Sequence, residues 1–278
     1  MEVQELLMAL HSTDAATQRM AVAELSQQQA KIAVPEVVLL LASPDPALRS
    51  LSASFLGQVA DRGDREVGEQ LIPLLQDDEE LVRSDAALAL GLLHYRQAIS
   101  ALSTSAKDDA EWLVRVQALE ALDCFRDPSL FPIFQWVLAH DEEHTVQRYA
   151  ADGIHSIAEP EQIPIIQQDI ETYKEDPEII VRLILALYRL GVTGSLDRFL
   201  QLLASVMDYD TLYYCLHSLT KAIKGQVPPH MIADFPRIAA ALDELTQHFP
   251  DIYLYRDELK GRFQHIQAGN IISPDGCC

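Results

Sequence analysis

One stretch of this sequence has the residue types and spacing of a zinc-dependent hydrolase. His140-Asp-Glu-Glu-His144 matches the pattern H-x-x-E-H, in which two histidines bind zinc and a glutamate lies beside the metal-bound water. That chemistry requires both histidines on one face of a helix interior. Here the five residues are in register with the acidic stretches Asp77–Glu80 and Asp108–Glu111. We therefore expect a turn between helices and no dedicated metal site, although two histidines and a carboxylate retain some capacity to bind a metal ion.

Other signatures of catalysis are absent from the sequence. It contains no G-x-x-x-x-G-K-[ST], G-x-G-x-x-G or G-x-S-x-G, so nucleotide-binding loops and the hydrolase nucleophile elbow have no support. Cys124 and Cys215 fall in predicted helices, where we interpret them as small buried hydrophobic residues. The pair Cys277-Cys278 can be a prenylation site in eukaryotes. We expect no catalytic residues and no cofactor.

A pattern of acidic turn, arginine and small-residue helix recurs along most of the chain. Its copies, aligned on the arginine, are 30, 34, 32, 32, 35 and 32 residues apart. A period of this size indicates a solenoid of helical repeats. The aligned positions are Arg19, Arg49, Arg83, Arg115, Gln147, Arg182 and Tyr214.

Each repeat is predicted to contain a first helix, an acidic turn and a second helix. Prolines mark the starts of first helices, where a missing N–H costs nothing; they are Pro35, Pro73, Pro132 and Pro164. An aspartate in each turn can cap the second helix; these are Asp14, Asp45, Asp78, Asp109, Asp141, Asp176 and Asp208. Small side chains four positions after most of the aligned arginines allow successive second helices to approach closely.

The repeated arginines are interpreted as a structural ladder. Each long cation can pair with the acidic turn of its own or a neighbouring repeat. The ladder is predicted to comprise Arg19, Arg49, Arg83, Arg115 and Arg182. Gln147 and Tyr214 interrupt it, so those two repeats must satisfy their turns differently.

The repeat pattern, xxVRxxAAxxLG after an Asp-containing turn, resembles the HEAT-like repeats of the phycobilisome-lyase type. The resemblance covers about residues 3–222 and implies an all-α solenoid. Bilin lyases, phycobilisome-degradation factors, cofactor-insertion helpers and scaffold proteins share this pattern. Deoxyhypusine hydroxylase is another member type and holds iron through His-Glu dipeptides, none of which occurs in this sequence.

The expected fold is an all-α solenoid of about seven helix pairs with a C-terminal helical cap. We place the repeats in residues 1–224, the capping helices in residues 225–268 and a flexible tail in residues 269–278. The cap is predicted to contain one helix from about Met231 to His248 and another from Asp251 to Gln267. Such a cap covers the last exposed core face of a solenoid.

The charge of the chain limits the partners it can bind. With 42 acidic and 21 basic side chains the net charge is −21, a field that repels phosphate backbones and anionic lipids and attracts cationic proteins. The N-terminus lacks the features of a secretory signal, and no run reaches the ~18 apolar residues of a spanning helix. We expect a cytoplasmic protein that binds neither nucleic acid nor membranes.

Two surfaces are predicted to bind a partner. Equivalent turns of a solenoid lie side by side, so their carboxylates should form one negative ridge; the residues are Asp77, Asp78, Glu79, Glu80, Asp108, Asp109, Glu111, Asp141, Glu142, Glu143, Glu175 and Asp176. The second surface is the apolar inner face of the sixth and seventh repeats, with Leu183, Leu187, Tyr213, Leu216 and Leu219. This face either lies under the C-terminal cap or forms a groove for a partner helix or an apolar cofactor such as a bilin.

These observations favour a non-enzymatic adaptor or scaffold that binds another protein with a basic surface. A bilin lyase or cofactor-handling factor is the alternative that the resemblance implies. A second alternative is an inhibitor or immunity protein that covers a basic enzyme surface.

Overall fold

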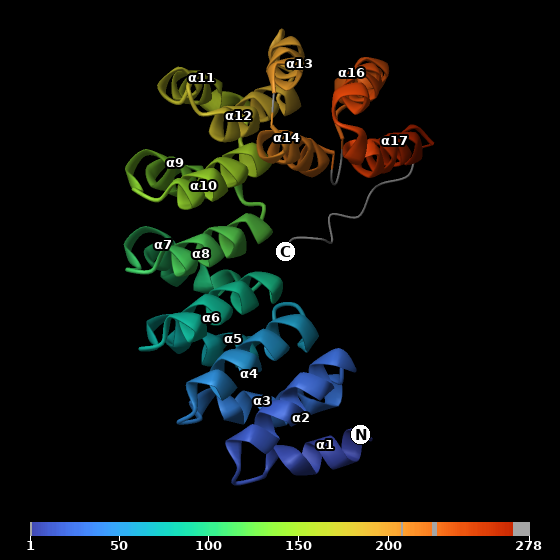
Figure 1. The fold of residues 1–278 in the computed structure, drawn as a ribbon. Helices are drawn as coiled ribbons and strands as arrows, with labels where there is room; N and C mark the ends of the chain where they lie inside the picture. The colour runs from blue at the N-terminus through green and yellow to red at the C-terminus, as the bar shows by residue number, and fades with distance from the viewer. Residues whose placement is uncertain (1, 207, 224–226, 269–278) are drawn as a thin grey trace. The chain divides into compact units, whose positions relative to one another are not determined.

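The chain is all-α. The computed structural model describes residues 2–206, 208–223 and 227–268, and every regular element in these ranges is a helix (Figure 1). The α-helices are α1 Val3–Leu10, α2 Ala15–Gln27, α3 Val34–Leu39, α4 Pro46–Val59, α5 Arg65–Leu71, α6 Glu80–Leu92, α7 Ile99–Asp108, α8 Trp112–Cys124, α9 Phe131–His140, α10 His144–Ile157, α11 Ile163–Thr172, α12 Pro177–Arg189, α13 Ser195–Ser205, α14 Tyr209–Ala222, α15 Pro229–Ala233, α16 Phe235–His248 and α17 Tyr253–Gln267. The predicted solenoid of seven helix pairs, α1 to α14, is confirmed.

The described chain divides into two compact units. The first unit contains residues 2–127 and 139–149, and the second contains residues 128–138 and those described from 150 to 268. The division falls within the pair formed by α9 and α10. The expected tail at residues 269–278, with Cys277 and Cys278, and the expected boundary at 224–225 lie outside the described residues.

In the first unit the second helices of successive repeats, α4, α6 and α8, pack directly on one another. Gly57 and Gly91 lie at these contacts. A Cβ atom built on Gly57 would be 2.6 Å from the Cα atom of Ala89, and one built on Gly91 would be 2.5 Å from the Cα atom of Ala121. The glycine of the repeated Leu-Gly pair is therefore required by the spacing between helices.

The aspartate caps occur in two forms. The side chains of Asp14, Asp45, Asp176 and Asp208 accept hydrogen bonds from backbone N–H groups of the first turn of α2, α4, α12 and α14. In the third repeat the prediction of Asp78 was wrong by one residue. It is the Asp77 carboxylate that accepts a hydrogen bond from the backbone N–H of Glu79, at 3.0 Å. Asp77 and Glu79 are two residues apart, which is the spacing of an Asx-turn.

Three of the four predicted proline positions lie in the first turn of a helix. Pro35, Pro132 and Pro164 follow the first residue of α3, α9 and α11. Pro73 differs, because α5 begins eight residues earlier, at Arg65, with Asp64 as its N-cap. The chain around Pro73 forms the 3₁₀ segment Ile72–Gln76, in which the missing N–H of proline interrupts the α-helical ladder.

In the second unit α12 is the most buried helix, as its apolar sequence predicts. Each residue from Ile179 to Tyr188 is buried. The predicted helix from Met231 to His248 is instead two helices, α15 and α16, because Pro236 at the start of α16 cannot occupy a helix interior. Ile252, Leu259 and Phe263 bury one face of the following segment, as their spacing predicts.

We compared the described helices with the requirements for crossing a membrane. None of them combines the length and the apolar character that crossing a bilayer requires.

Candidate functional site

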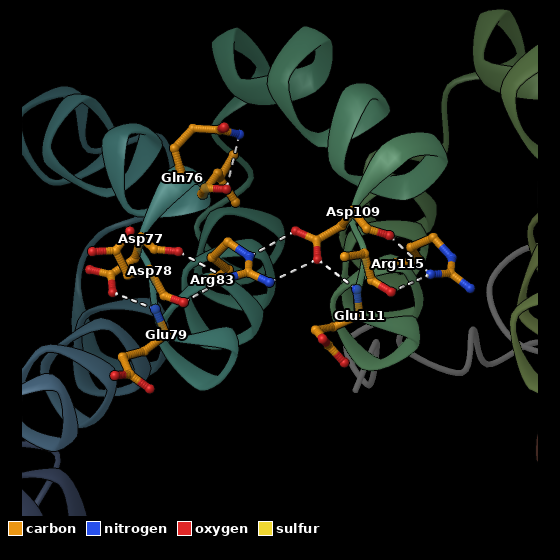
Figure 2. Close-up of polar contacts among 10 residues, drawn as sticks. Gln76, Asp77, Asp78, Glu79, Arg83, Asp109, Glu111 and Arg115 are labelled. Carbon is orange, nitrogen blue, oxygen red and sulfur yellow. Dashed lines mark hydrogen bonds and ion pairs between the residues drawn. The ribbon is translucent and has the colours of Figure 1, made fainter.

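The arginines of the first unit join consecutive turns. Arg49 donates from Nε and Nη2 to the two carboxylate oxygens of Asp77, both at 2.7 Å. Arg83 binds Asp109 in the same two-pronged geometry at 2.8 and 3.0 Å (Figure 2). Arg115 does so with Asp141 at 2.6 and 2.9 Å, and Arg19 also pairs with Asp45. Each arginine therefore binds the aspartate of the following turn.

The same arginines also bind the backbone of their own turns. Arg83 donates from Nη1 to the carbonyl oxygens of Asp77 at 2.9 Å and Asp78 at 3.2 Å (Figure 2). Arg115 makes the equivalent contact with the Asp109 carbonyl oxygen at 2.9 Å. One guanidinium thus satisfies the carbonyl groups of one turn and the carboxylate of the next, which holds adjacent repeats in register.

Gln147 shows what the ladder loses where arginine is replaced. Its amide Nε2 donates to the carbonyl oxygen of Asp141 at 2.8 Å, so the contact with its own turn remains. A neutral amide has no second set of donors with which to bind a carboxylate in the fork geometry of arginine. The substitution therefore keeps the turn satisfied without the charged pair.

The ladder separates two kinds of turn carboxylate. The side chains of Asp77, Asp109 and Asp141 are only 12%, 8% and 5% exposed. The hydrogen bonds from Arg49 keep the pKa of Asp77 below its usual value. These three aspartates were expected to contact a partner, but their acceptor atoms are already occupied by the ladder and by the backbone. We therefore assign them to the structure of the repeats.

The remaining turn carboxylates of the first unit face solvent. We call the exposed residues Asp78, Glu79, Glu80, Asp108, Glu142 and Glu143 the acidic edge. Glu111, which was also predicted to belong to this surface, is half-buried and is not counted in it. They come from three consecutive turns that Arg83 and Arg115 join. Glu175 and Asp176 belong to the second unit and are not counted in the acidic edge. Asp176 caps α12 through its side chain.

A depression lies between the third and fourth turns. It has a volume of about 400 Å³, and its lining includes Gln76, Asp77, Asp78, Arg83, Asp108 and Asp109. A second depression of about 330 Å³, one turn earlier, includes Arg49 and Asp77 in its lining. The acidic edge therefore has recesses between turns into which a side chain of a partner can extend.

The H-x-x-E-H stretch lies across a turn, as predicted. His140 is the last residue of α9 and His144 is the first of α10, and both are exposed. The described residues contain no group of three or more histidine, cysteine, aspartate or glutamate side chains placed to hold a metal ion.

The second unit contains a buried ionic cluster that the sequence did not predict. Asp152 of α10 accepts from Arg182 Nε at 2.9 Å and from Lys221 Nζ at 3.1 Å, so α12 and α14 both contribute a cation to one carboxylate. The Arg182 guanidinium also lies over the Tyr214 ring, 5.7 Å from its centroid. Arg182 thus differs from the other ladder arginines, because it binds a helix residue of the preceding repeat and not the next turn.

The charges of this cluster determine its ionisation. Burial alone would raise the pKa of Asp152, but Arg182 and Lys221 lower it to about 2. Burial raises the pKa of the neighbouring Cys215 thiol to about 12, which makes it a poor nucleophile at neutral pH. The cluster is therefore a buried ion network that joins α10, α12 and α14.

Comparison with known proteins defines the repeat class. Residues 58–123 match the family of HEAT repeats. This match places HEAT repeats at α5, α6 and α7 and in parts of the neighbouring helices. No curated protein sequence matches it significantly.

Several solved structures are similar to this chain. The X-ray structure of YibA from Escherichia coli superposes with a TM-score of 0.55 at 17% identity, covering 79% of this chain and 82% of YibA. The complex of CpcE and CpcF of phycocyanin lyase from Nostoc gives a TM-score of 0.48 at 19% identity, covering 80% and 95%. Human deoxyhypusine hydroxylase in complex with glycerol gives a TM-score of 0.39 at 15% identity, and the match covers 95% of this chain and 96% of the hydroxylase. At these identities the likeness concerns the fold alone.

The second unit does not offer the predicted apolar surface. Leu183, Leu187, Leu216 and Leu219 are buried, so the expectation that they contact a partner was wrong. They lie in the core because α12 packs on α11, α13 and α14. Tyr213, the fifth predicted residue, is 46% exposed.

Proposed function

We propose that this HEAT-like repeat protein is a non-enzymatic adaptor whose acidic edge binds a partner protein with a basic surface. One observation carries the proposal: the arginine ladder neutralises Asp77, Asp109 and Asp141 and leaves most of the other carboxylates of these turns exposed. Asp78, Glu79, Glu142 and Glu143 then face solvent on turns that are fixed relative to one another. A rigid array of like charges favours a partner of opposite charge.

The composition supports the same class of partner. A chain with a net charge of −21 attracts basic proteins and repels nucleic acids. The depressions between turns are open to lysine and arginine side chains, which can extend toward Asp78 and Asp108. HEAT-like repeats present such surfaces without a need for catalytic residues.

The proposal is tested by comparing two variants of equal charge. In the edge variant, Asp78 becomes Asn and Glu79, Glu142 and Glu143 become Gln. In the control variant Gln replaces four glutamates that are exposed elsewhere on the described surface: Glu66, Glu161, Glu171 and Glu244.

Wild type and both variants are used to capture partners from native cell extract, and captured proteins are identified by mass spectrometry. We expect a basic protein that wild type and the control variant retain and the edge variant loses. Equal capture by the two variants would refute a role for the acidic edge. A captured basic enzyme whose activity is blocked would assign the inhibitor function to the same surface.

Mixing the purified protein with a free bilin separates the adaptor from a cofactor-handling factor. We expect the absorption spectrum of the bilin to remain that of the free pigment. A shifted spectrum at stoichiometric protein would instead support the lyase-type alternative.

A further inference from the structure

An exposed cluster of aromatic side chains lies on the second unit, on elements that the acidic edge does not include. Tyr209, Tyr213 and His217 are spaced four residues apart on α14 and therefore share one helix face. Tyr213 stacks on His217 with ring centroids 5.9 Å apart. It also meets Tyr255 of α17 edge to face at 5.9 Å, and Tyr209 meets Phe249 in the same way at 5.0 Å. We call these five side chains the tyrosine cluster.

The tyrosines of this cluster are only partly buried by their mutual contacts. Tyr209, Tyr213 and Tyr255 remain 47%, 46% and 37% exposed. Tyrosine is enriched in the energetically important part of protein interfaces, because it offers a large rigid area at a small cost in conformational entropy. Tyr213 contacts both Tyr255 and His217, so these rings form one continuous surface.

The charges around the cluster select the partner. Asp208, Asp210 and Asp251 are exposed beside it, and the Tyr209 hydroxyl donates to Asp251 at 3.3 Å. The cations of α17 are already paired within the unit: Arg256 with Asp257, Lys260 with Asp243 and Arg262 with Glu258. The rim of the cluster is therefore acidic, and a second copy of this chain would bring the same negative charge to it.

From this geometry we propose that the tyrosine cluster binds an arginine-bearing segment of a partner protein. A guanidinium group is planar, stacks on the face of a tyrosine ring and donates paired hydrogen bonds to a carboxylate. Tyr213 and Tyr255 supply the rings, and Asp210 and Asp251 supply the carboxylates. A lysine ammonium is a strongly hydrated point charge and uses the rings less well. The surface should therefore prefer arginine to lysine at equal charge.

The proposal is tested with two fluorescein-labelled peptides of equal length and charge. One alternates arginine with glycine, and the other has lysine in place of arginine. Anisotropy is measured with the full chain at physiological ionic strength and again at raised ionic strength, where exposed charge pairs are screened. We expect the arginine peptide to bind several-fold more tightly, and we expect this preference to persist in salt.

Substitutions assign the preference to the cluster. Tyr213→Ala and Tyr255→Ala should each weaken the arginine peptide about two- to fivefold, the effect of losing one exposed cation–π contact. Tyr213→Phe should retain binding because it keeps the ring. Leu254 lies on α17 beside Tyr255, and its side chain is more exposed than that of Tyr255. Leu254→Ala should have no effect on peptide binding. The edge variant should keep the preference for arginine, which separates this surface from the acidic edge.

A measurement on the unmodified protein covers the case in which an alanine variant does not fold. With ring-labelled tyrosine, the NMR signals of Tyr209, Tyr213 and Tyr255 should shift on addition of the arginine peptide. Equal binding of the two peptides, unchanged binding by Tyr213→Ala, or unmoved ring signals would each overturn the proposal. Ring signals that shift with protein concentration alone would show that a second copy occupies the cluster, with the same consequence.

Discussion

Arg83 illustrates how a single side chain can hold two repeats together. It binds both oxygens of Asp109 and two carbonyl oxygens of its own turn, and its side chain is mostly buried. Arg83→Ala leaves all these acceptors without their donor, so we expect a loss of about 1–3 kcal/mol in the free energy of unfolding. Denaturant unfolding followed by circular dichroism measures it.

Arg65 provides the matched control for Arg83. Its side chain is 82% exposed and pairs with Glu69 one turn along the same helix. Arg65→Ala should lower the stability far less than Arg83→Ala, because solvent screens an exposed pair of this spacing. If the two variants unfold at the same denaturant concentration, the ladder does not stabilise the array.

Asp152 is the residue whose ionisation matters most for the second unit. Asp152→Asn leaves Arg182 buried without its counter-charge, and we expect a loss of about 3–5 kcal/mol near neutral pH. The pKa of Asp152 is lowered in the folded state to about 2. Its contribution to stability is therefore complete above the unfolded-state pKa of about 4 and is lost as the pH falls toward 2.

The pH dependence gives the Asp152 prediction its specific signature. Wild type and Asp152→Asn should differ fully at pH values above about 4, and the difference should shrink on further acidification. Asp78→Asn, at an exposed carboxylate, should stay within about 0.5 kcal/mol of wild type at neutral pH. A difference between wild type and Asp152→Asn that grows on acidification would contradict the ion network described above.

The two histidines of the H-x-x-E-H stretch can be tested directly. His140 and His144 lie at the ends of different helices, so a helical zinc site cannot form from them. The double variant His140→Ala with His144→Ala should keep the stability and the partner binding of wild type. Stoichiometric zinc in freshly purified wild type, absent from the double variant, would show that this turn binds metal.

At the scale of the helix, the distance between α6 and α8 is set by a missing side chain. A Cβ on Gly91 would meet the backbone of Ala121 at 2.5 Å, so the helices must move apart to admit it. Gly91→Ala should therefore destabilise the protein by about 1–3 kcal/mol, although alanine is the better helix former. Differential unfolding in denaturant measures the effect.

Gly261 of α17 offers the opposite case for the same substitution. Nothing lies within 4 Å of a Cβ built there. Gly261→Ala should leave stability unchanged or raise it by up to about 1 kcal/mol through the lower backbone entropy of the unfolded chain. If Gly91→Ala lowers the stability and Gly261→Ala does not, the loss at Gly91 comes from packing and not from helix propensity. Equal effects of both would refute the steric explanation for Gly91.

The helices show which features of the fold follow from local sequence. The second helices could be predicted because caps such as Asp14 and Asp45 act within a few residues. The start of α5 could not be read from Pro73, because Asp64 caps the helix earlier and the proline lies in a 3₁₀ turn. Pro236 divides the expected helix into α15 and α16, which the proline rule alone would have predicted.

The candidate sites depend more on tertiary contacts than the helices do. Ser54, Leu88 and Glu120 occupy the position equivalent to Asp152 and are half-buried, so the repeat pattern does not indicate a buried carboxylate there. Asp152 is paired through tertiary contacts with the cations of α12 and α14, which the local sequence does not show. Likewise, α12 is apolar on nearly every face, and its sequence cannot tell which face its neighbours cover.

At the scale of the whole molecule, the turn carboxylates of the first unit divide into structural and exposed groups. The ladder uses Asp77, Asp109 and Asp141, whereas the carboxylates of the acidic edge contribute little to the packing of the repeats. Exposed like charges repel one another and give no net stability. The edge is therefore free to serve binding, and substitutions there should separate function from folding.

The kinetics of partner binding should show how the acidic edge acts. Long-range attraction speeds encounter, and salt screens it over a Debye length of ~8 Å at physiological ionic strength. For a basic partner, the association rate should fall steeply with salt. Neutralising Asp78, Glu79, Glu142 and Glu143 should lower the association rate much more than it raises the dissociation rate, because exposed charges mainly steer encounter. Surface plasmon resonance at low and high salt, with the control variant of equal charge beside the edge variant, measures both rates. An association rate that responds to neither salt nor these four substitutions would leave the acidic edge with solubility as its only role.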